Sequence, residues 1–219
     1  MELNVCYYPP KRAIFGTDSE ATHPFHLEGE VSYIVEMTTW DTQTLQELCM
    51  TDLNGLDNFP IYSLAEFYNG DQEEFEELFQ KHNMQFEIFP GSKKNTFYVK
   101  VVIQTSHQFK QYFPHLHWIS THHSHLSLWS LKQDVFQLKE KEYESDIAHK
   151  RTKNNRTYYV RPKWIANAPY VTLTESSTMF WIGHDGAYIT AFSNDQRYAT
   201  IESLQQTILK NYELTLGEY

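Results

Sequence analysis

Cysteine is scarce in this chain of 219 residues, which contains only Cys6 and Cys49. Two cysteines are too few for a disulfide framework, and they lack the Cys-x-x-Cys spacing of zinc or redox sites. We therefore expect both to be reduced thiols in the core. No apolar run approaches the roughly 18 residues of a membrane span, and the N-terminus lacks the pattern of a signal peptide. These absences predict a soluble, cytoplasmic protein with no membrane partner.

Common catalytic and ligand-binding motifs are also missing. The sequence has no Walker loop, dinucleotide fingerprint, Gly-x-Ser-x-Gly or His-Glu-x-x-His. The segment "HSHLSL" contains His-x-His, but it lacks the aspartate and third histidine of metallo-β-lactamase-like hydrolases. It supplies only one of the two His-x-Ser/Thr copies that two-histidine phosphoesterases use. We therefore expect no cofactor, and the motifs identify no family.

Positive charge is rare in the first half of the chain. Residues 1–105 carry 6 Lys and Arg residues against 17 Asp and Glu residues, a net charge of −11, whereas residues 106–219 carry 12 against 11. Eight of the 11 histidines lie in that second half. We expect a single domain over residues 1–219, and its division into an acidic lobe at 1–105 and a histidine-rich lobe at 106–219 is the alternative. An acidic surface repels phosphates and attracts basic partners, so direct nucleic-acid binding is not expected.

Hydrophobic periodicity predicts an α+β fold with a mostly antiparallel sheet and several short helices, with a two-lobed form as the alternative. Alternating apolar residues indicate a strand at residues 30–37, a hairpin at 84–104 and an antiparallel meander within 156–192. Asp185-Gly186 predicts a tight turn inside this meander. The strands and helices occur in groups rather than in strict alternation, which favours α+β over a doubly wound parallel sheet.

Four segments carry helix signals. Residues 71–82 place Phe75, Leu78, Phe79 and His82 on one stripe and glutamates on the other faces. A capping box at Thr44 and Glu47 predicts a helix after the first internal strand. Ser63 and Glu66 predict a second short helix in "SLAEFY", and Thr200 is a plausible N-cap for the C-terminal helix.

The acidic helix provides the leading functional hypothesis. Proteins that cap basic enzymes need an acidic surface with a few aromatic anchors. The sequence therefore favours a non-catalytic, immunity- or inhibitor-like protein whose likeliest partner is a basic protein. Its binding residues would be four glutamates and three aromatics: Glu73, Glu74, Glu76, Glu77, Tyr62, Phe67 and Tyr68.

A histidine-dependent hydrolase acting on phosphoesters, with or without metal assistance, is the alternative hypothesis. The segment "FPHLHWISTHHSHLSLW" holds five histidines within residues 113–129. If its two His-x-His pairs lie on neighbouring strands, His115, His117, His123 and His125 converge on a patch that suits zinc. Pro114 could instead open a helix through the first pair. In the hydrolase, general acid and base would come from His123, His125 and His184, although we expect the protein to bind no metal.

Overall fold

The computed structural model describes residues 1–9, 25–39, 41–53, 58–123, 126–144, 148–153 and 156–217, without the side chains of Thr42, His123 and His184. The fold is α+β, with a mainly antiparallel nine-stranded sheet and two smaller sheets, as the sequence predicts. In the described part of the chain, no helix is long and apolar enough to cross a membrane.

The nine-stranded sheet has the order β14-β1-β3-β13-β12-β7-β4-β6-β5, and strands from both sides of Thr105 belong to it. Only the pairing of β1 with β14 is parallel among its described ladders. In chain order, its strands are β1 (Glu2–Tyr8), β3 (Tyr33–Thr38), β4 (Ile61–Tyr68), β5 (Gln85–Pro90), β6 (Thr96–Ile103), β7 (Ser127–Leu131), β12 (Thr178–Ile182), β13 (Tyr188–Ser193) and β14 (Glu213–Leu216).

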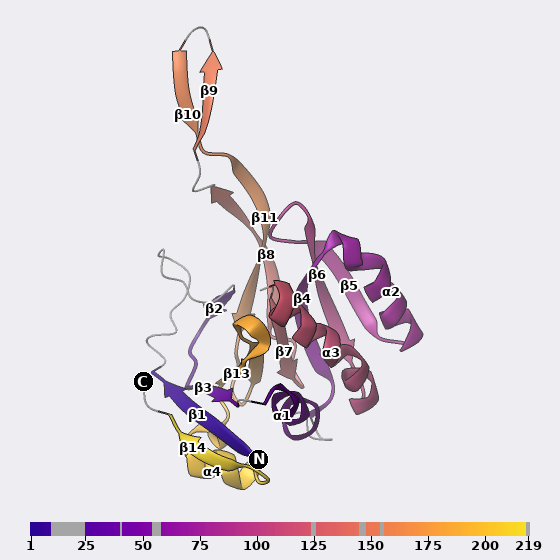
Figure 1. Cartoon of the computed structure of the whole chain (residues 1–219), viewed down its shortest axis with the longest axis vertical. Helices are drawn as coiled ribbons and strands as arrows, with labels where there is room; N and C mark the ends of the chain where they lie inside the picture. The colour runs from indigo at the N-terminus through magenta and orange to yellow at the C-terminus, as the bar shows by residue number, and fades with distance from the viewer. Residues whose placement is uncertain are drawn as a thin grey trace.

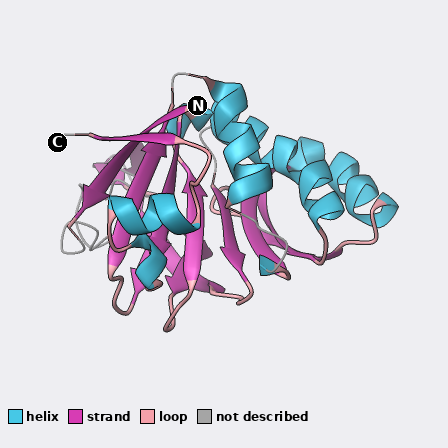
Figure 2. Cartoon of the chain, turned by 90° about the horizontal axis from the view of Figure 1, so that it is seen from below, coloured by secondary structure: helices cyan, strands magenta, loops and turns pink. Residues whose placement is uncertain are grey.

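Helices cover one face of this sheet (Figure 2). Because successive residues of a strand point to opposite faces, Met37 of β3 packs toward the helices and Ile34 packs into a second core on the other face. The helical elements are α1 (Thr42–Glu47), η2 (Leu48–Asp52), η4 (Asn69–Asp71), α2 (Gln72–Lys81), α3 (Ser106–His123), η5 (His184–Gly186), η6 (Gln196–Tyr198) and α4 (Ile201–Thr207).

The second core lies between the large sheet and a three-stranded sheet of β2 (His26–Glu28), β11 (Lys163–Thr172) and β8 (Phe136–Glu144). Beyond this sheet, β9 (His149–Lys153) and β10 (Arg156–Val160) form a separate two-stranded ribbon. Figure 1 shows this ribbon projecting from the body as an arm.

The structure confirms the helix within residues 71–82, the hairpin of β5 and β6, and the helix after Thr200. The hydroxyl of Thr200 accepts a hydrogen bond from the Ser203 N–H (3.1 Å). Asp185-Gly186 does form the connection between β12 and β13, with both residues at positive φ. The predicted meander is only partly correct, since β11 pairs with β8 in the smaller sheet.

Two predictions of helix N-caps are wrong. The segment "SLAEFY" belongs to β4, where the Ser63 hydroxyl donates to the Leu128 carbonyl (2.9 Å) and the Glu66 carboxylate accepts from the Thr96 hydroxyl (2.7 Å). The N-cap of α1 is Asp41 rather than Thr44, because its carboxylate accepts from the Gln43 N–H (3.2 Å) and the Thr44 N–H (3.1 Å).

Candidate functional site: the groove between α2 and α3

The acidic helix α2 is fixed to the body by its aromatic residues. Phe75 and Phe79 are buried, and the rings of Phe75 and Phe67 lie 3.8 Å apart between centroids. Glu73 and Glu74 lie in the first turn of α2, where negative charge complements the helix dipole. This packing holds the charged side of α2 toward solvent.

Helix α3 packs beside α2 and presents one large aromatic outward. Phe109, Phe113 and Leu116 recur at helical spacing and are fully buried. Trp118 lies off this stripe, with 41% of its surface exposed, and its ring stacks on that of His122 at 5.2 Å. Helix α3 thus contributes an exposed tryptophan that is already oriented by a neighbouring ring.

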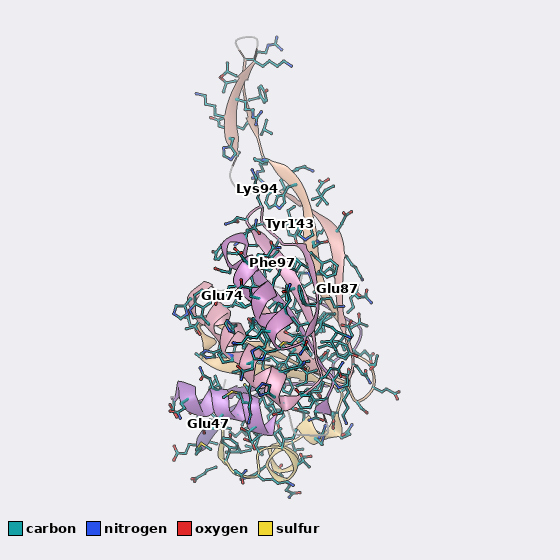
Figure 3. All side chains as sticks on the ribbon, turned by 90° about the vertical axis from the view of Figure 1, so that its right-hand side faces the viewer. Glu47, Glu74, Glu87, Lys94, Phe97 and Tyr143 are labelled. Carbon is teal, nitrogen blue, oxygen red and sulfur yellow. The ribbon has the colours of Figure 1, made fainter. Side chains whose placement is uncertain are left out.

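A groove of about 330 Å³ lies between the two helices. Asp71 and Glu74 provide carboxylates at its α2 side, and Trp118 lines it from α3. Figure 3 labels Glu74, which belongs to α2. The full lining comprises Asp71, Glu74, Phe75, Pro114, His115 and Trp118. The groove therefore combines negative charge with aromatic and apolar surface.

His115 is the titratable base inside the groove. Its ring meets that of Phe75 edge-on, with centroids 5.3 Å apart. Burial lowers the pKa of His115 below its ordinary value, and the nearby Glu74 carboxylate offsets this in part. Because a lowered pKa favours the neutral ring at pH 7, His115 does not cancel the negative charge of the groove.

The structure separates the aromatic anchors that the sequence analysis grouped with the glutamates. Phe67 lies beneath α2 with 1% of its surface exposed, so it supports the helix and is closed to a partner. Tyr62 packs against the second core and lines a different groove beside Lys100 and Asp134. Tyr68 shares the β4 face of Tyr62 by strand alternation. The predicted trio therefore does not surround α2.

The four predicted glutamates do share α2. Glu73, Glu74 and Glu77 are exposed, while Glu76 is half-buried and accepts a hydrogen bond from the Gln72 amide (2.7 Å). Within the described residues, no ion pair involves any of the four. Their charge is therefore available at the surface.

Of the two alternatives for the first His-x-His pair, the structure has the helix and not the strand, because His115 and His117 both belong to α3. Pro114 lies inside this helix, which matches the helical alternative more closely than the strand. His115 faces α2, whereas His117 lies next to Gln46 and Gly186. Two residues apart on a helix, the rings point in different directions, so they do not converge as the zinc hypothesis requires.

His117 is almost fully buried, with 7% of its surface exposed. Its Nδ1 lies 3.3 Å from the Gln46 amide nitrogen, which can donate to Nδ1 when the ring is neutral, and the buried Nε2 has no hydrogen-bond partner among the described residues. Burial lowers the pKa of His117, and the neighbouring backbone of Gly186 offsets this in part. The ring is a buried, neutral contact between α3 and η5.

The remaining histidines of the hydrolase hypothesis lie largely outside the residues that the structure describes. His123 ends α3, but its side chain, the whole of His125 and the side chain of His184 are not described. Among the described residues, no group of three or more His, Cys, Asp or Glu side chains could hold a metal ion. The hydrolase stays a prediction without a described catalytic arrangement.

Sequence analysis missed Trp118 and Asp71 as site residues. A signal for Trp118 was present, since it falls between the stripe positions Leu116 and Ile119, and an off-stripe tryptophan faces solvent. The groove itself could not be predicted, because it depends on how two helices far apart in the chain pack together. Comparison of the chain with protein-family models, curated proteins and solved structures finds no match in any of the three.

Proposed function

We propose that this chain is a non-catalytic, cytosolic protein-binding protein that holds a basic partner at the α2–α3 groove, in the manner of an immunity protein or inhibitor. The observation that carries the proposal is the groove of about 330 Å³ with Asp71 and Glu74 on one side and the exposed Trp118 on the other. An acidic helix alone is ordinary surface. The adjoining groove with an aromatic wall gives a partner something to bury.

The groove chemistry suits a lysine or arginine side chain. A cation over the face of a tryptophan ring is stabilised by about 0.5–1 kcal/mol at exposed sites and by about 2 kcal/mol or more when desolvated. Asp71 and Glu74 add opposite charge beside that ring. Because His115 is neutral, it adds no repulsion.

Long-range charge would bring the partner to this face. The excess of 17 acidic over 6 basic residues in positions 1–105 supplies an attractive field for a basic protein. Such fields raise association rates more than they raise affinity, and salt weakens them. Affinity would then come from Trp118, since tryptophans are enriched among the few residues that dominate binding energy.

Capture of partners from a native extract tests this function. We expect the wild-type chain to retain a basic protein, and added salt to weaken its retention. The variant Glu73→Gln/Glu74→Gln/Glu76→Gln/Glu77→Gln should lose most of that retention. Retention of nothing, or retention indifferent to salt and to these changes, would contradict the proposal.

A matched control variant distinguishes the effect of the α2 glutamates from the effect of the total net charge. Four other exposed glutamates, distributed over β1, β5, the β11–β12 connection and β14, can be neutralised together: Glu2→Gln/Glu87→Gln/Glu175→Gln/Glu213→Gln. This control has the same net charge as the α2 variant, and we expect it to keep the partner. Equal loss in both variants would mean that overall charge, and not the groove, accounts for binding.

A further inference from the structure

The arm is the most basic part of the molecule. Residues 148–163 contain six Lys and Arg residues and no Asp or Glu, which gives this segment a net charge of +6. The whole chain has a net charge of −10, so the remaining residues carry −16. Strands β9 and β10 of this segment pair as an antiparallel ribbon. All residues of β9 and all of β10 except Val160 are exposed. The basic residues are Lys150, Arg151, Lys153, Arg156, Arg161 and Lys163.

Strand register sorts these cations onto faces. Residues directly opposite in an antiparallel pair share a face, and the faces alternate along the strands. The first face, which we call the Arg151 face, carries the pairs Arg151 with Tyr158, Lys153 with Arg156 and His149 with Val160. The opposite face carries Lys150 with Tyr159 and Thr152 with Thr157. Three permanent cations therefore gather around Tyr158.

Distance separates the far end of the arm from the acidic body, whereas next to its base Lys163 pairs with Glu142 (2.7 Å) and Glu144 (3.6 Å) of β8. Strands rise about 3.4 Å per residue, so a ribbon of five pairs is roughly 17 Å long. That is about twice the Debye length of roughly 8 Å at physiological ionic strength. Figure 1 shows the arm pointing away from the body, and Figure 3 shows its side chains spreading into open space. The arm can therefore contact a polyanion while the acidic body stays too far away to repel it strongly.

We propose that the arm binds duplex DNA, with the Arg151 face against the phosphates that border the major groove. The major groove is about 12 Å wide and admits a two-stranded β-ribbon. Arg and Lys side chains supply the phosphate contacts that dominate such binding. The sequence argued against nucleic acid because an acidic surface repels phosphates, but β9 and β10 contain no Asp or Glu, and strand pairing places Tyr158 opposite Arg151.

The composition of the Arg151 face selects duplex over single-stranded DNA. Single-stranded binding surfaces stack successive bases on several aromatic rings. The Arg151 face has one tyrosine, Tyr158, among three cations, with the smaller ring of His149 at its base. This ratio favours contact with phosphates.

Fluorescence anisotropy with a labelled duplex of about 20 base pairs tests the proposal in the full chain. Three phosphate contacts give a slope of log K against log[salt] of about −2.7, so affinity should fall roughly 40-fold between 50 and 200 mM salt. We expect Arg151→Ala/Lys153→Ala/Arg156→Ala to weaken binding at least about tenfold at 50 mM salt and to remove most of this slope. Arg151→Lys/Arg156→Lys should preserve most of the binding.

Two controls locate the contact. Lys93→Ala/Lys94→Ala/Lys110→Ala removes three exposed cations from the body and should leave binding unchanged. Tyr158→Ala should weaken binding several-fold, whereas Tyr159→Ala, on the opposite face, should not. A melting temperature and circular dichroism spectrum like those of the wild type confirm that each variant is folded.

Three outcomes would overturn the proposal. The first is the absence of duplex binding by the wild type at 50 mM salt. The second is equal weakening by the arm variant and the body control. The third is that the arm binds another polyanion more tightly than it binds the duplex. The polyanions to compare are a single-stranded oligonucleotide, phosphatidylserine vesicles and polyglutamate, and tighter binding of any of these would assign the arm to a different ligand.

Discussion

Gly186→Ala should destabilise the fold by about 2–5 kcal/mol. Gly186 lies in η5 at φ +66°, a conformation that costs other residues roughly 1–2 kcal/mol. An added Cβ would lie 2.6 Å from the Thr121 hydroxyl and 2.9 Å from His117 Nε2. Both atoms belong to α3, so the methyl group would push η5 away from this helix. Overpacking of this kind costs about a further 1–3 kcal/mol.

Gly29→Ala is the matched control, because Gly29 also has positive φ (+84°) but nothing lies within 4 Å of its added Cβ. It should cost only the backbone component of about 1–2 kcal/mol. Urea denaturation followed by circular dichroism measures both changes. Thr121→Ala in the Gly186→Ala background should recover part of the loss, because it removes the nearest contact. If the two glycine variants lose equal stability, the close packing of η5 against α3 is refuted.

Two further predictions concern buried titratable groups. Burial holds the pKa of His117 below its unfolded value of about 6.5, so the unfolded chain takes up this proton first as pH falls. The contribution of His117 to the free energy of unfolding should be fully present above about pH 6.5 and should decline below it, by at most about 1.4 kcal/mol per pH unit. His117→Gln should therefore reduce the pH dependence of the free energy of unfolding, measured with urea between pH 7.5 and 5.5. An unchanged pH dependence in this variant would contradict a neutral buried ring. Burial also raises the pKa of Cys49 well above its ordinary value. Ellman's reagent should therefore modify Cys49 only after denaturation, whether or not Cys6 is replaced by serine, and rapid native labelling of Cys49 would be inconsistent with its burial.

Sequence periodicity predicted those elements whose apolar side chains recur at a regular spacing. In α2, Phe75 and Phe79 recur at helical spacing and are buried as expected. The same reasoning failed for β4, since Ser63 and Glu66 look like cap residues in sequence while their partners, Leu128 and Thr96, come from other strands. Local pattern carries no information about such long-range partners.

The candidate site was predictable only in part. The charge of α2 could be read directly from its glutamates, but the choice of aromatic anchors could not, because Phe67 and Tyr62 point to opposite sides of β4. The histidine segment misled for a related reason. Its His-x-His spacing suggested a strand, while the buried stripe of Phe109, Phe113 and Leu116 determines a helix.

Titration calorimetry of the captured basic partner against two tryptophan variants tests the central claim most directly. Trp118 and Trp164 are each 41% exposed, but only Trp118 lines the α2–α3 groove. A residue that dominates an interface costs at least about 2 kcal/mol on truncation, which is roughly a 30-fold loss of affinity. We predict that loss for Trp118→Ala and an unchanged dissociation constant for Trp164→Ala. An unchanged dissociation constant for Trp118→Ala would contradict the assignment of the groove as the binding site.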